Sequence, residues 1–314
     1  MKKKILIIST GVLSAYLAQF LLKKKFKIFV TTRKIKKKYI NFSKLGIQKK
    51  IIIFELDILK KKSIEKCLIS VKPDMIFYFA GQSSIVKSFL HPKETLESNY
   101  TGCKNFLTIL KKRKLKTKFI KANSGYIFSD LNKKNLTNSN LITPNSPYVL
   151  AQSKAYKLVN DFRKKKVNCY SAIFFNAESS LRPKTFFIKK ACSFVKKNKF
   201  KKNKLKIGNI NMFRDFGWAP ELVSGTFYMT KLKPCNAILA SGQKTSLSSI
   251  LNHIFKIKKL DYKKYIQEDK KFIRESEAKN ITCNIRPTIQ MLKSFGWKPS
   301  VFGKKLVHKI YNDS

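Results

Sequence analysis

The stretch Lys4–Lys25, KILIISTGVLSAYLAQFLLKKK, decides the fold class of this chain. It opens with a short apolar run, which stops at Ser9–Gly11 and is followed by Leu17, Phe20 and Leu21 on one helical face. A basic start before an apolar stretch is also typical of a signal peptide or a membrane anchor. Polar residues interrupt this stretch, however, and make it a poor membrane core. We therefore interpret it as a buried parallel strand, a turn and an amphipathic helix of a soluble protein.

The same strand-then-helix pattern repeats over about the first 176 residues. Five further apolar runs predict strands: Phe26–Arg33, Ile51–Ile58, Pro73–Ser84, Lys118–Phe128 and Asn168–Asn176. Helical patterns with short turns separate them, which predicts an α/β fold with a Rossmann-type, doubly wound parallel sheet. The alternation weakens after residue 176. We expect a first domain at 1–176 and a smaller C-terminal lobe at 177–314, with some returning segments joining the first domain.

The composition is strongly basic. Among 314 residues the formal net charge is +51, from 68 Lys and Arg against 17 Asp and Glu. A dedicated nucleic-acid surface concentrates charge on one face and uses arginine, whereas here lysine is spread along every segment. We interpret the excess as a compositional bias that gives only non-specific attraction to nucleic acids and other polyanions, and that favours an anionic substrate.

Cysteine and histidine exclude two other classes of site. The six cysteines form no CxxC pair, which favours reduced thiols in a cytoplasmic protein. The three histidines, His91, His253 and His308, are too scattered for a metal site, so no metal is expected.

The turn after the first strand is where a parallel α/β fold meets a pyrophosphate. Ile8, Gly11 and Ser14 occupy the positions of a Gly-x-x-Gly-x-x-Gly pattern, so one glycine of three is present. An ordinary strand-to-helix turn explains this equally well. Arg33, at the end of the second strand, suits the 2′-phosphate of NADP, although a plain surface cation is an equal alternative. Asp57, after the third strand, is expected near the adenine.

Several segments, in order, are similar to one enzyme family. They are FAGQSSIVKSF (Phe79–Phe89), FFNAESSLRPKTF (Phe174–Phe186), GNINMFRDFGWAPELV (Gly208–Val223), FIRESEAKN (Phe272–Asn280) and FGWKPS (Phe295–Ser300). Their wording resembles the extended short-chain dehydrogenase/reductase family (the NAD-dependent epimerases and dehydratases), and within it the GDP-mannose 4,6-dehydratases. The resemblance runs from about Lys4 to Lys305.

The resemblance implies a chemistry and its residues. In this family a nicotinamide oxidises C4 of a bound hexose, water is lost across C5 and C6, and the hydride returns at C6. It implies that Tyr148 is the base for the C4 hydroxyl and that Ser124, 24 residues earlier, aligns the substrate. A helix-start aromatic that covers a core edge is the alternative for Tyr148.

Two catalytic positions depart from the family. Gln152 replaces the lysine that lowers the tyrosine pKa, and a neutral amide cannot do this by Coulomb attraction. Lys154 is two residues on, about 200° around the helix, and points away. Tyr126 replaces the glutamate of the elimination step, and a tyrosine is a poor base at neutral pH. Ala177 replaces a histidine of the substrate segment.

The resemblance also implies two binding sets. The cofactor set, with NADP favoured over NAD, is Gly11, Ser14, Arg33, Asp57, Ala80 and Gln82. The nucleotide-sugar set is Ser83, Asn176, Glu178, Arg182, Asn209, Arg214, Arg274 and Glu277, for which surface salt bridging is the alternative reading of each charged member. Residues 1–176 would then be the NAD(P)-binding domain and 177–314 the nucleotide-sugar-binding lobe.

Three functions remain open at this point. The first is a GDP-mannose 4,6-dehydratase-like enzyme of deoxysugar or surface-polysaccharide synthesis, with a 4-ketosugar reductase or epimerase as a close variant. The second is a catalytically impaired nucleotide-sugar-binding relative that pairs with an active subunit. The third is a polyanion-binding basic protein. In the family, helices like Asn99–Lys114 and Tyr148–Arg163 pair two subunits, so a homodimer or tetramer is expected.

Overall fold

The structure is a computed structural model that describes residues 2–128, 140–201, 203–272 and 279–313. Within these residues the chain forms two compact units. The first comprises residues 2–128, 140–174 and 223–239, and the second comprises 175–222 and 240–313.

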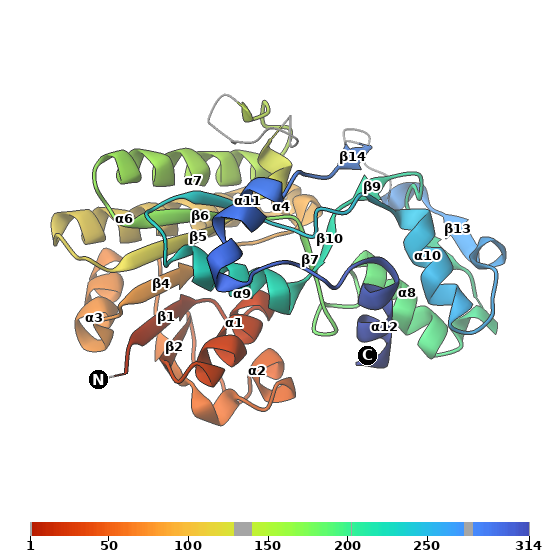
Figure 1. Ribbon diagram of the computed structural model, residues 1–314, viewed down its shortest axis with the longest axis horizontal. Coiled ribbons are helices and arrows are strands. Elements are labelled where there is room, and N and C mark those ends of the chain that lie inside the picture. Colours follow the sequence, from red (N-terminus) through yellow and green to blue (C-terminus); the bar gives the residue numbers. More distant parts are fainter. Residues whose placement is uncertain (1, 129–139, 202, 273–278, 314) are drawn as a thin grey trace. The chain divides into compact units, whose positions relative to one another are not determined.

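The first unit is built on a seven-stranded sheet in the order β11-β6-β5-β4-β1-β2-β3. All neighbouring strands are parallel. The order reverses between β1 and β4, which confirms the doubly wound, Rossmann-type fold predicted from the sequence (Figure 1). The strands are β1 (Lys4–Ile8), β2 (Lys27–Thr32), β3 (Ile52–Glu55), β4 (Met75–Tyr78), β5 (Lys118–Ser124), β6 (Cys169–Phe174) and β11 (Asn236–Leu239).

Helices cover both faces of this sheet. One face carries α3 (Lys61–Val71), α6 (Gly102–Lys112) and α7 (Pro147–Lys164), whose apolar residues share a core with β4 and β5. On the other face, α1 (Val12–Lys23) packs on α9 (Ala219–Met229), with the rings of Phe20 and Phe227 5.7 Å apart. The shorter helices are α2 (Ile40–Lys44), η1 (Gln48–Lys50), α4 (Ile85–Leu90), α5 (Pro92–Leu96), η2 (Glu97–Thr101) and η3 (Gly125–Ile127).

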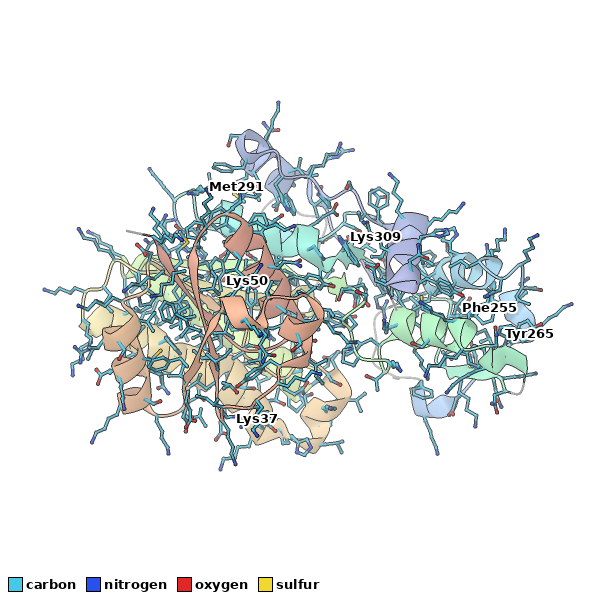
Figure 2. The ribbon with its side chains drawn as sticks, turned by 90° about the horizontal axis from the view of Figure 1, so that it is seen from below. Lys37, Lys50, Phe255, Tyr265, Met291 and Lys309 are labelled. Carbon is cyan, nitrogen blue, oxygen red and sulfur yellow. The ribbon has the colours of Figure 1, made fainter. Side chains whose placement is uncertain are left out.

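The second unit combines short strands with helices. Its core lies between α8 (Phe187–Lys196), α10 (Leu247–Lys256) and α12 (Gly303–Asn312). The ring of Phe255 stacks on that of Tyr265 at 5.9 Å, and Figure 2 labels both side chains. Its other elements are β7 (Asn176–Glu178), η5 (Lys199–Lys201), β8 (Leu205–Ile207), β9 (Phe213–Arg214), β10 (Phe216–Trp218), β12 (Thr245–Ser246), η6 (Tyr262–Lys264), β13 (Ile266–Glu268), η7 (Lys270–Phe272), β14 (Asn280–Ile281), α11 (Arg286–Met291) and η8 (Lys293–Phe295).

Most of the positive charge is at the surface. Figure 2 shows long side chains that end in nitrogen projecting from the outline of the molecule. Lys37 and Lys50, both labelled there, are exposed. None of the described helices combines the length and the apolar character needed to cross a bilayer. The opening apolar stretch is divided between β1 and α1, as its interrupted pattern predicts.

Candidate functional site

The parallel sheet brings many of the predicted site residues to one edge. Ile8 ends β1, Arg33 follows β2, Ala80 follows β4 and Ser124 ends β5. Since parallel strands share their carboxyl ends, these residues lie along the edge where α/β folds bind their ligands. The switch point between β1 and β4 belongs to this edge.

In the turn after β1, the residue with a positive φ is Ser9 and not a glycine. Ile8 has its branched side chain fully buried in the sheet core, so it does not obstruct the turn. Ser9 takes the positive φ of 142°, a region that favours glycine. Its Oγ accepts a hydrogen bond from the backbone N–H of Gly11 at 2.9 Å. Gly11, at φ −72°, therefore holds no conformation that only glycine could adopt.

The start of α1 suits a phosphate group. Its N-cap Gly11 supplies no side-chain hydrogen bond, and its first turn carries no acidic residue. Ser14 is fully buried, and its Oγ has no hydrogen-bond partner among the described residues. Uncapped N–H groups at a helix N-terminus favour an anion. The turn can therefore receive a pyrophosphate even though two of the three pattern glycines are absent.

Arg33 and Asp57, the two residues predicted on the adenosine side, follow the ends of β2 and β3. The Arg33 side chain is 78% exposed, and its Nη2 lies 3.5 Å from Oε1 of Glu94. An ion pair this exposed is weak, so it leaves the guanidinium able to exchange partners. Asp57 accepts the backbone N–H of Leu59 at Oδ1 over 2.9 Å and lies 3.9 Å from Nζ of Lys60.

The loop after β4 packs closely on η2. Gly81 has φ +150°, and a Cβ there would lie 2.1 Å from Oδ1 of Asn99, so this position excludes any side chain. The Asn99 Nδ2 donates to the backbone carbonyl of Gln82 at 3.0 Å. The Gln82 amide donates in turn to the carbonyl of Ser84 at 2.7 Å. Ser83, predicted to bind substrate, is exposed in the same loop.

Ser124 and Tyr148 lie at the end of a strand and at the start of the next helix, as the sequence predicts. Ser124 ends β5, and its Oγ accepts the N–H of Tyr126 at 3.2 Å, which leaves the hydroxyl proton available for donation. Tyr148 lies in the first turn of α7, where Ser146 caps the helix by accepting the N–H of Val149 at 3.2 Å. Both side chains are buried, and Tyr126 is half-buried in η3.

Gln152 belongs to a buried polar cluster that the sequence did not reveal. Its Nε2 donates to Oδ1 of Asn99 at 2.8 Å. From β5, Asn123 donates to the Gln152 backbone carbonyl at 3.3 Å and to its Oε1 at 3.4 Å. Lys154 is exposed, with Nζ 6.0 Å from the ring centroid of Tyr100, so it is no substitute for the missing lysine. The cluster of Gln152, Asn99 and Asn123 is called the amide cluster below.

In the second unit, Glu178 and Arg182 form a buried polar group. Glu178 is 3% exposed, and Oε1 lies 3.6 Å from Nη2 of Arg182. Burial raises the pKa of Glu178, and the guanidinium opposes this. Within the described part of the chain, Glu178 Oε2, Arg182 Nε and the Oγ of Ser179 have no hydrogen-bond partner. Such orphaned groups fit a polar ligand, since buried polar atoms are normally paired.

The remaining predicted substrate residues differ in their surroundings. Arg214 is buried, and its Nη1 donates to the carbonyls of Phe213 at 2.7 Å and Lys279 at 3.2 Å, which ties β9 to the segment before β14. Asn176 donates through Nδ2 to the carbonyl of Asp215 at 3.0 Å. Asn209 is exposed in a loop. The predictions for Arg274 and Glu277 lie outside the described residues.

Asp215 is a buried carboxylate that the sequence reasoning passed over. Its oxygens accept from the N–H and the hydroxyl of Ser241, both at 2.8 Å, and from the N–H of Gly242 at 2.7 Å. Burial raises its pKa, while these hydrogen bonds lower it. With this many donors, the carboxylate holds the Ser241 turn against β9 and has a structural role.

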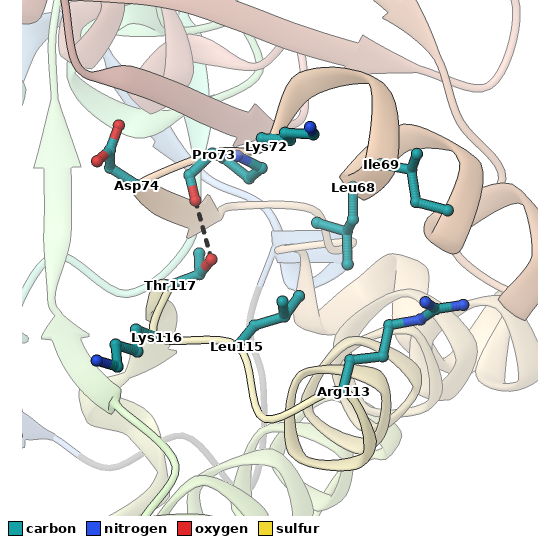
Figure 3. A pocket seen from close by; sticks show the side chains of 9 residues that line it. All are labelled: Leu68, Ile69, Lys72, Pro73, Asp74, Arg113, Leu115, Lys116 and Thr117. Atoms are coloured by element: carbon teal, nitrogen blue, oxygen red, sulfur yellow. Dashed lines mark hydrogen bonds between the residues drawn. The ribbon is translucent and has the colours of Figure 1, made fainter.

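An open pocket lies away from these residues. It has a volume of about 500 Å³ and is lined by residues of α3, of the α6 end and of the turns that lead into β4 and β5. Figure 3 shows it, with the hydroxyl of Thr117 donating to the carbonyl of Pro73 at 2.9 Å. Those turns precede their strands, so the pocket is at the amino edge of the sheet. It is therefore distinct from the candidate site.

A known family matches almost the whole chain. The family model described as GDP-mannose 4,6 dehydratase matches residues 9–310. The chain belongs to the GDP-mannose 4,6-dehydratase family. Among relatives in this family, GDP-mannose 4,6 dehydratase 1 of Arabidopsis thaliana is 25% identical over 318 residues, with 97% of this chain and 87% of that protein covered. The GDP-mannose 4,6-dehydratase of Vibrio cholerae is 26% identical over 267 residues, with 80% and 71% covered.

Solved structures support the same fold. A dTDP-glucose 4,6-dehydratase of Bacillus anthracis, solved in complex with NAD, matches with a TM-score of 0.82 at 15% identity and covers 99% of this chain and 96% of its own. A UDP-glucose 4-epimerase of Thermotoga maritima, solved with UDP-glucose, matches with a TM-score of 0.82 at 17% identity, with 98% of each chain covered. These two structures therefore share the fold of this chain.

Proposed function

We propose that this protein binds a nicotinamide dinucleotide and a nucleotide sugar, and that it oxidises the sugar at C4 as a GDP-mannose 4,6-dehydratase does. The observation that carries the proposal is the placement of Tyr148 and Ser124 at the carboxyl edge of the sheet, in a chain of this family. The cofactor, when bound, would accept and return the hydride. The substrate we propose is GDP-mannose or a derivative of it.

The chain's own residues would move the proton. The Tyr148 phenolate would take the proton of the C4 hydroxyl, and the Ser124 hydroxyl would donate a hydrogen bond to the same oxygen. A phenol is a weak base at neutral pH, so it needs a nearby positive charge to lower its pKa. Gln152 cannot supply that charge, because its amide is neutral and is held by Asn99.

The proposed cofactor is NADP. The uncapped start of α1 and the orphaned Oγ of Ser14 support a pyrophosphate at that turn. Arg33 supports a 2′-phosphate, because its side chain is exposed and its ion pair with Glu94 is weak. Asp57, Ala80 and Gln82 complete the proposed cofactor set.

The proposed sugar-nucleotide contacts are in the second unit. Arg182 supports an anionic ligand and Glu178 supports a polar one, because among the described residues Arg182 Nε and Glu178 Oε2 are buried without a hydrogen-bond partner. Asn176, Asn209, Arg214, Arg274 and Glu277 belong to the same proposed set, and Ser83 of the first unit is its other member. Arg214 donates to two backbone carbonyls, so we propose for it the structural role of holding β9 in place beside the ligand site.

A second candidate function follows from position 126. The family's elimination step uses a carboxylate there, and Tyr126 has none. This favours related chemistry without water loss, as in a 4-ketosugar reductase or epimerase. A catalytically impaired subunit that pairs with an active partner is the further alternative, and Gln152 in place of lysine supports it.

Titration separates these alternatives. NADP, NADPH and NAD are titrated into the protein, and GDP-mannose is then added and followed by NMR. Conversion to a 4-keto-6-deoxy sugar, absent in Tyr148→Phe, supports the dehydratase. Oxidation at C4 or epimerisation without loss of water supports the variant chemistry, and binding without turnover supports the impaired subunit. Loss of all binding at moderate salt would overturn every one of these and leave a polyanion binder.

The proposed setting is a cytoplasmic homodimer or tetramer. All six cysteines are free thiols, which suits a reducing compartment. Pairing would use the outer faces of α6 and α7, as the resemblance implies. These faces carry exposed lysines, including Lys104, Lys111, Lys154 and Lys157, so the charge between two copies is unfavourable.

A further inference from the structure

A single lysine in the sheet core is unexplained by the proposed function. Lys121, in the middle of β5, is 1% exposed and ranks among the largest fully buried side chains of the described residues. Its Nζ lies 5.5 Å from the ring centroid of Tyr78 on β4, and it interacts electrostatically with Cys103 on α6. The ammonium group is therefore between the sheet and the helices that cover it.

Nothing negatively charged compensates for this ammonium in the described part of the chain. Lys121 takes part in none of the ion pairs found there, and its Nζ donates to the carbonyl of Ala122. Burial lowers its pKa from 10.5 to about 8, and Cys103 acts in the opposite direction. A buried, unpaired cation is costly, so packing alone gives no reason for a lysine here when a methionine would fill the space.

Two short routes connect Lys121 to the amide cluster. Along β5, Asn123 is two residues on and so faces the same side of the sheet, and it donates to Gln152. Along the helix, Cys103 is about one turn after Asn99, which accepts from Gln152. Lys121 is thus two residues along β5 from a side chain that donates to Gln152, and it interacts with a residue about one helical turn from Asn99. Along the backbone of β5, three residues of strand, roughly 10 Å, separate Lys121 from Ser124.

We propose that Lys121 supplies, from behind the amide cluster, the positive charge that favours the phenolate of Tyr148. Lys121 touches no reacting atom in this scheme and is a positioning residue that acts through its field. The neutral Gln152 then keeps the cluster hydrogen-bonded and avoids a second buried cation beside the first. The inference rests on the proposed function for its consequence, but it concerns the pKa of one phenol and can be tested without turnover.

The test measures the Tyr148 pKa directly. Protein carrying ring-labelled tyrosine is titrated by NMR with NADP present, and Tyr148→Phe assigns the resonance. Lys121→Met, which fills the same space without charge, should raise the Tyr148 pKa by roughly one unit, a tenfold loss of phenolate at a fixed pH. Lys121→Arg should restore it. Lys154→Met is the matched control, because Lys154 is exposed on the Tyr148 helix, and it should leave that pKa nearly unchanged.

The unchanged protein offers a second test if Lys121→Met fails to fold. The Tyr148 resonance should show an added step near pH 8, where Lys121 loses its proton. The other titratable groups that face Lys121 stay neutral there, because burial raises the pKa of Cys103 and Cys169 to about 12 and that of Tyr78 well above its ordinary value.

An unchanged Tyr148 pKa in Lys121→Met, or in the absence of that variant no step near pH 8, would overturn the role of Lys121. Either result would leave the proposed reaction untouched. Conversely, a shifted pKa in a protein that performs no hydride transfer would support Lys121 and refute the proposed function.

Discussion

Nε2 of Gln152 donates to Oδ1 of Asn99 across 2.8 Å, and both side chains are buried. This bond fixes an amide at the position where the family has a lysine. Helix α7 therefore carries a neutral, hydrogen-bonded side chain where the resemblance implies a charge. Among the described residues of the first unit, Lys121 on β5 is a buried basic side chain.

Gln152→Lys should raise hydride transfer. An ammonium in the family position lowers the Tyr148 pKa, and we expect a gain of roughly tenfold or more in the rate of cofactor reduction by GDP-mannose at pH 7. Gln152→Met, which removes the amide without adding charge, is the control and should give no gain. No gain from the lysine, with cofactor still bound, would mean that Tyr148 does not have the assigned role.

Gln152→Lys should raise the rate of hydride transfer more in the Lys121→Met background than in the unchanged protein. In the Lys121→Met background the new ammonium has no buried Lys121 ammonium to repel it, so the two changes should be strongly non-additive. Rates of the two single variants and of the double variant form the cycle. Simple additivity would indicate that the two positions do not act on a common group.

Gly81→Ala should destabilise the protein sharply. The added methyl group would meet Oδ1 of Asn99 at 2.1 Å, and φ is +150°. We expect a loss of roughly 2 kcal/mol or more in the free energy of unfolding, together with disturbance of the amide cluster. Gly46→Ala is the matched control, because φ is +65° there but no atom lies within 4 Å of the new Cβ. Equal losses in denaturant titrations of the two variants would contradict the close packing of Gly81 on Asn99.

Glu178→Gln should change both the pH dependence of stability and the affinity for the nucleotide sugar. Burial raises the folded-state pKa of Glu178 above its ordinary 4.5, so the folded protein binds this proton more tightly than the unfolded chain does. Stability contributed by the proton is therefore present at low pH and is lost as the pH rises from 4.5 through the raised value. Glu178→Gln should flatten this decline in unfolding experiments between pH 4 and pH 8, and it should weaken nucleotide-sugar binding at pH 7. A variant with an unaltered pH profile would show that Glu178 is not desolvated.

Self-association should strengthen with salt. The outer faces of α6 and α7 present Lys104, Lys111, Lys154 and Lys157, so two copies repel when their charges are unscreened. Sedimentation should show more dimer at high ionic strength than at low ionic strength. Lys154→Glu together with Lys157→Glu should reduce that dependence. Dimer that dissociates as salt rises would contradict pairing through these helices.

Much of the fold followed from short-range patterns. Apolar runs closed by turns identified every strand from β1 to β6, and the strand order then follows from the doubly wound topology. The strand β11 (Asn236–Leu239) was not predicted. It follows residues 175–222 of the second unit in the sequence, where the regular alternation of strand and helix has ended. Ser124 and Tyr148 were placed correctly on a strand end and a helix start because both are local features.

The buried polar groups could not be predicted in the same way. The Asn99–Gln152 bond joins residues 53 positions apart, which no local pattern encodes. Lys121 carries a signal, since it interrupts the apolar run of KFIKANS, but in a chain with 68 basic residues a single lysine does not stand out. Asp215 was hidden likewise, because its partners Ser241 and Gly242 come much later in the chain.

A crystal structure of the protein with NADP bound tests the central claim most directly. The account predicts that the pyrophosphate lies at the start of α1 and that the nicotinamide ring lies beside the hydroxyls of Tyr148 and Ser124. A cofactor bound elsewhere, for example in the pocket at the amino edge of the sheet, or a nicotinamide out of reach of both hydroxyls, would contradict it.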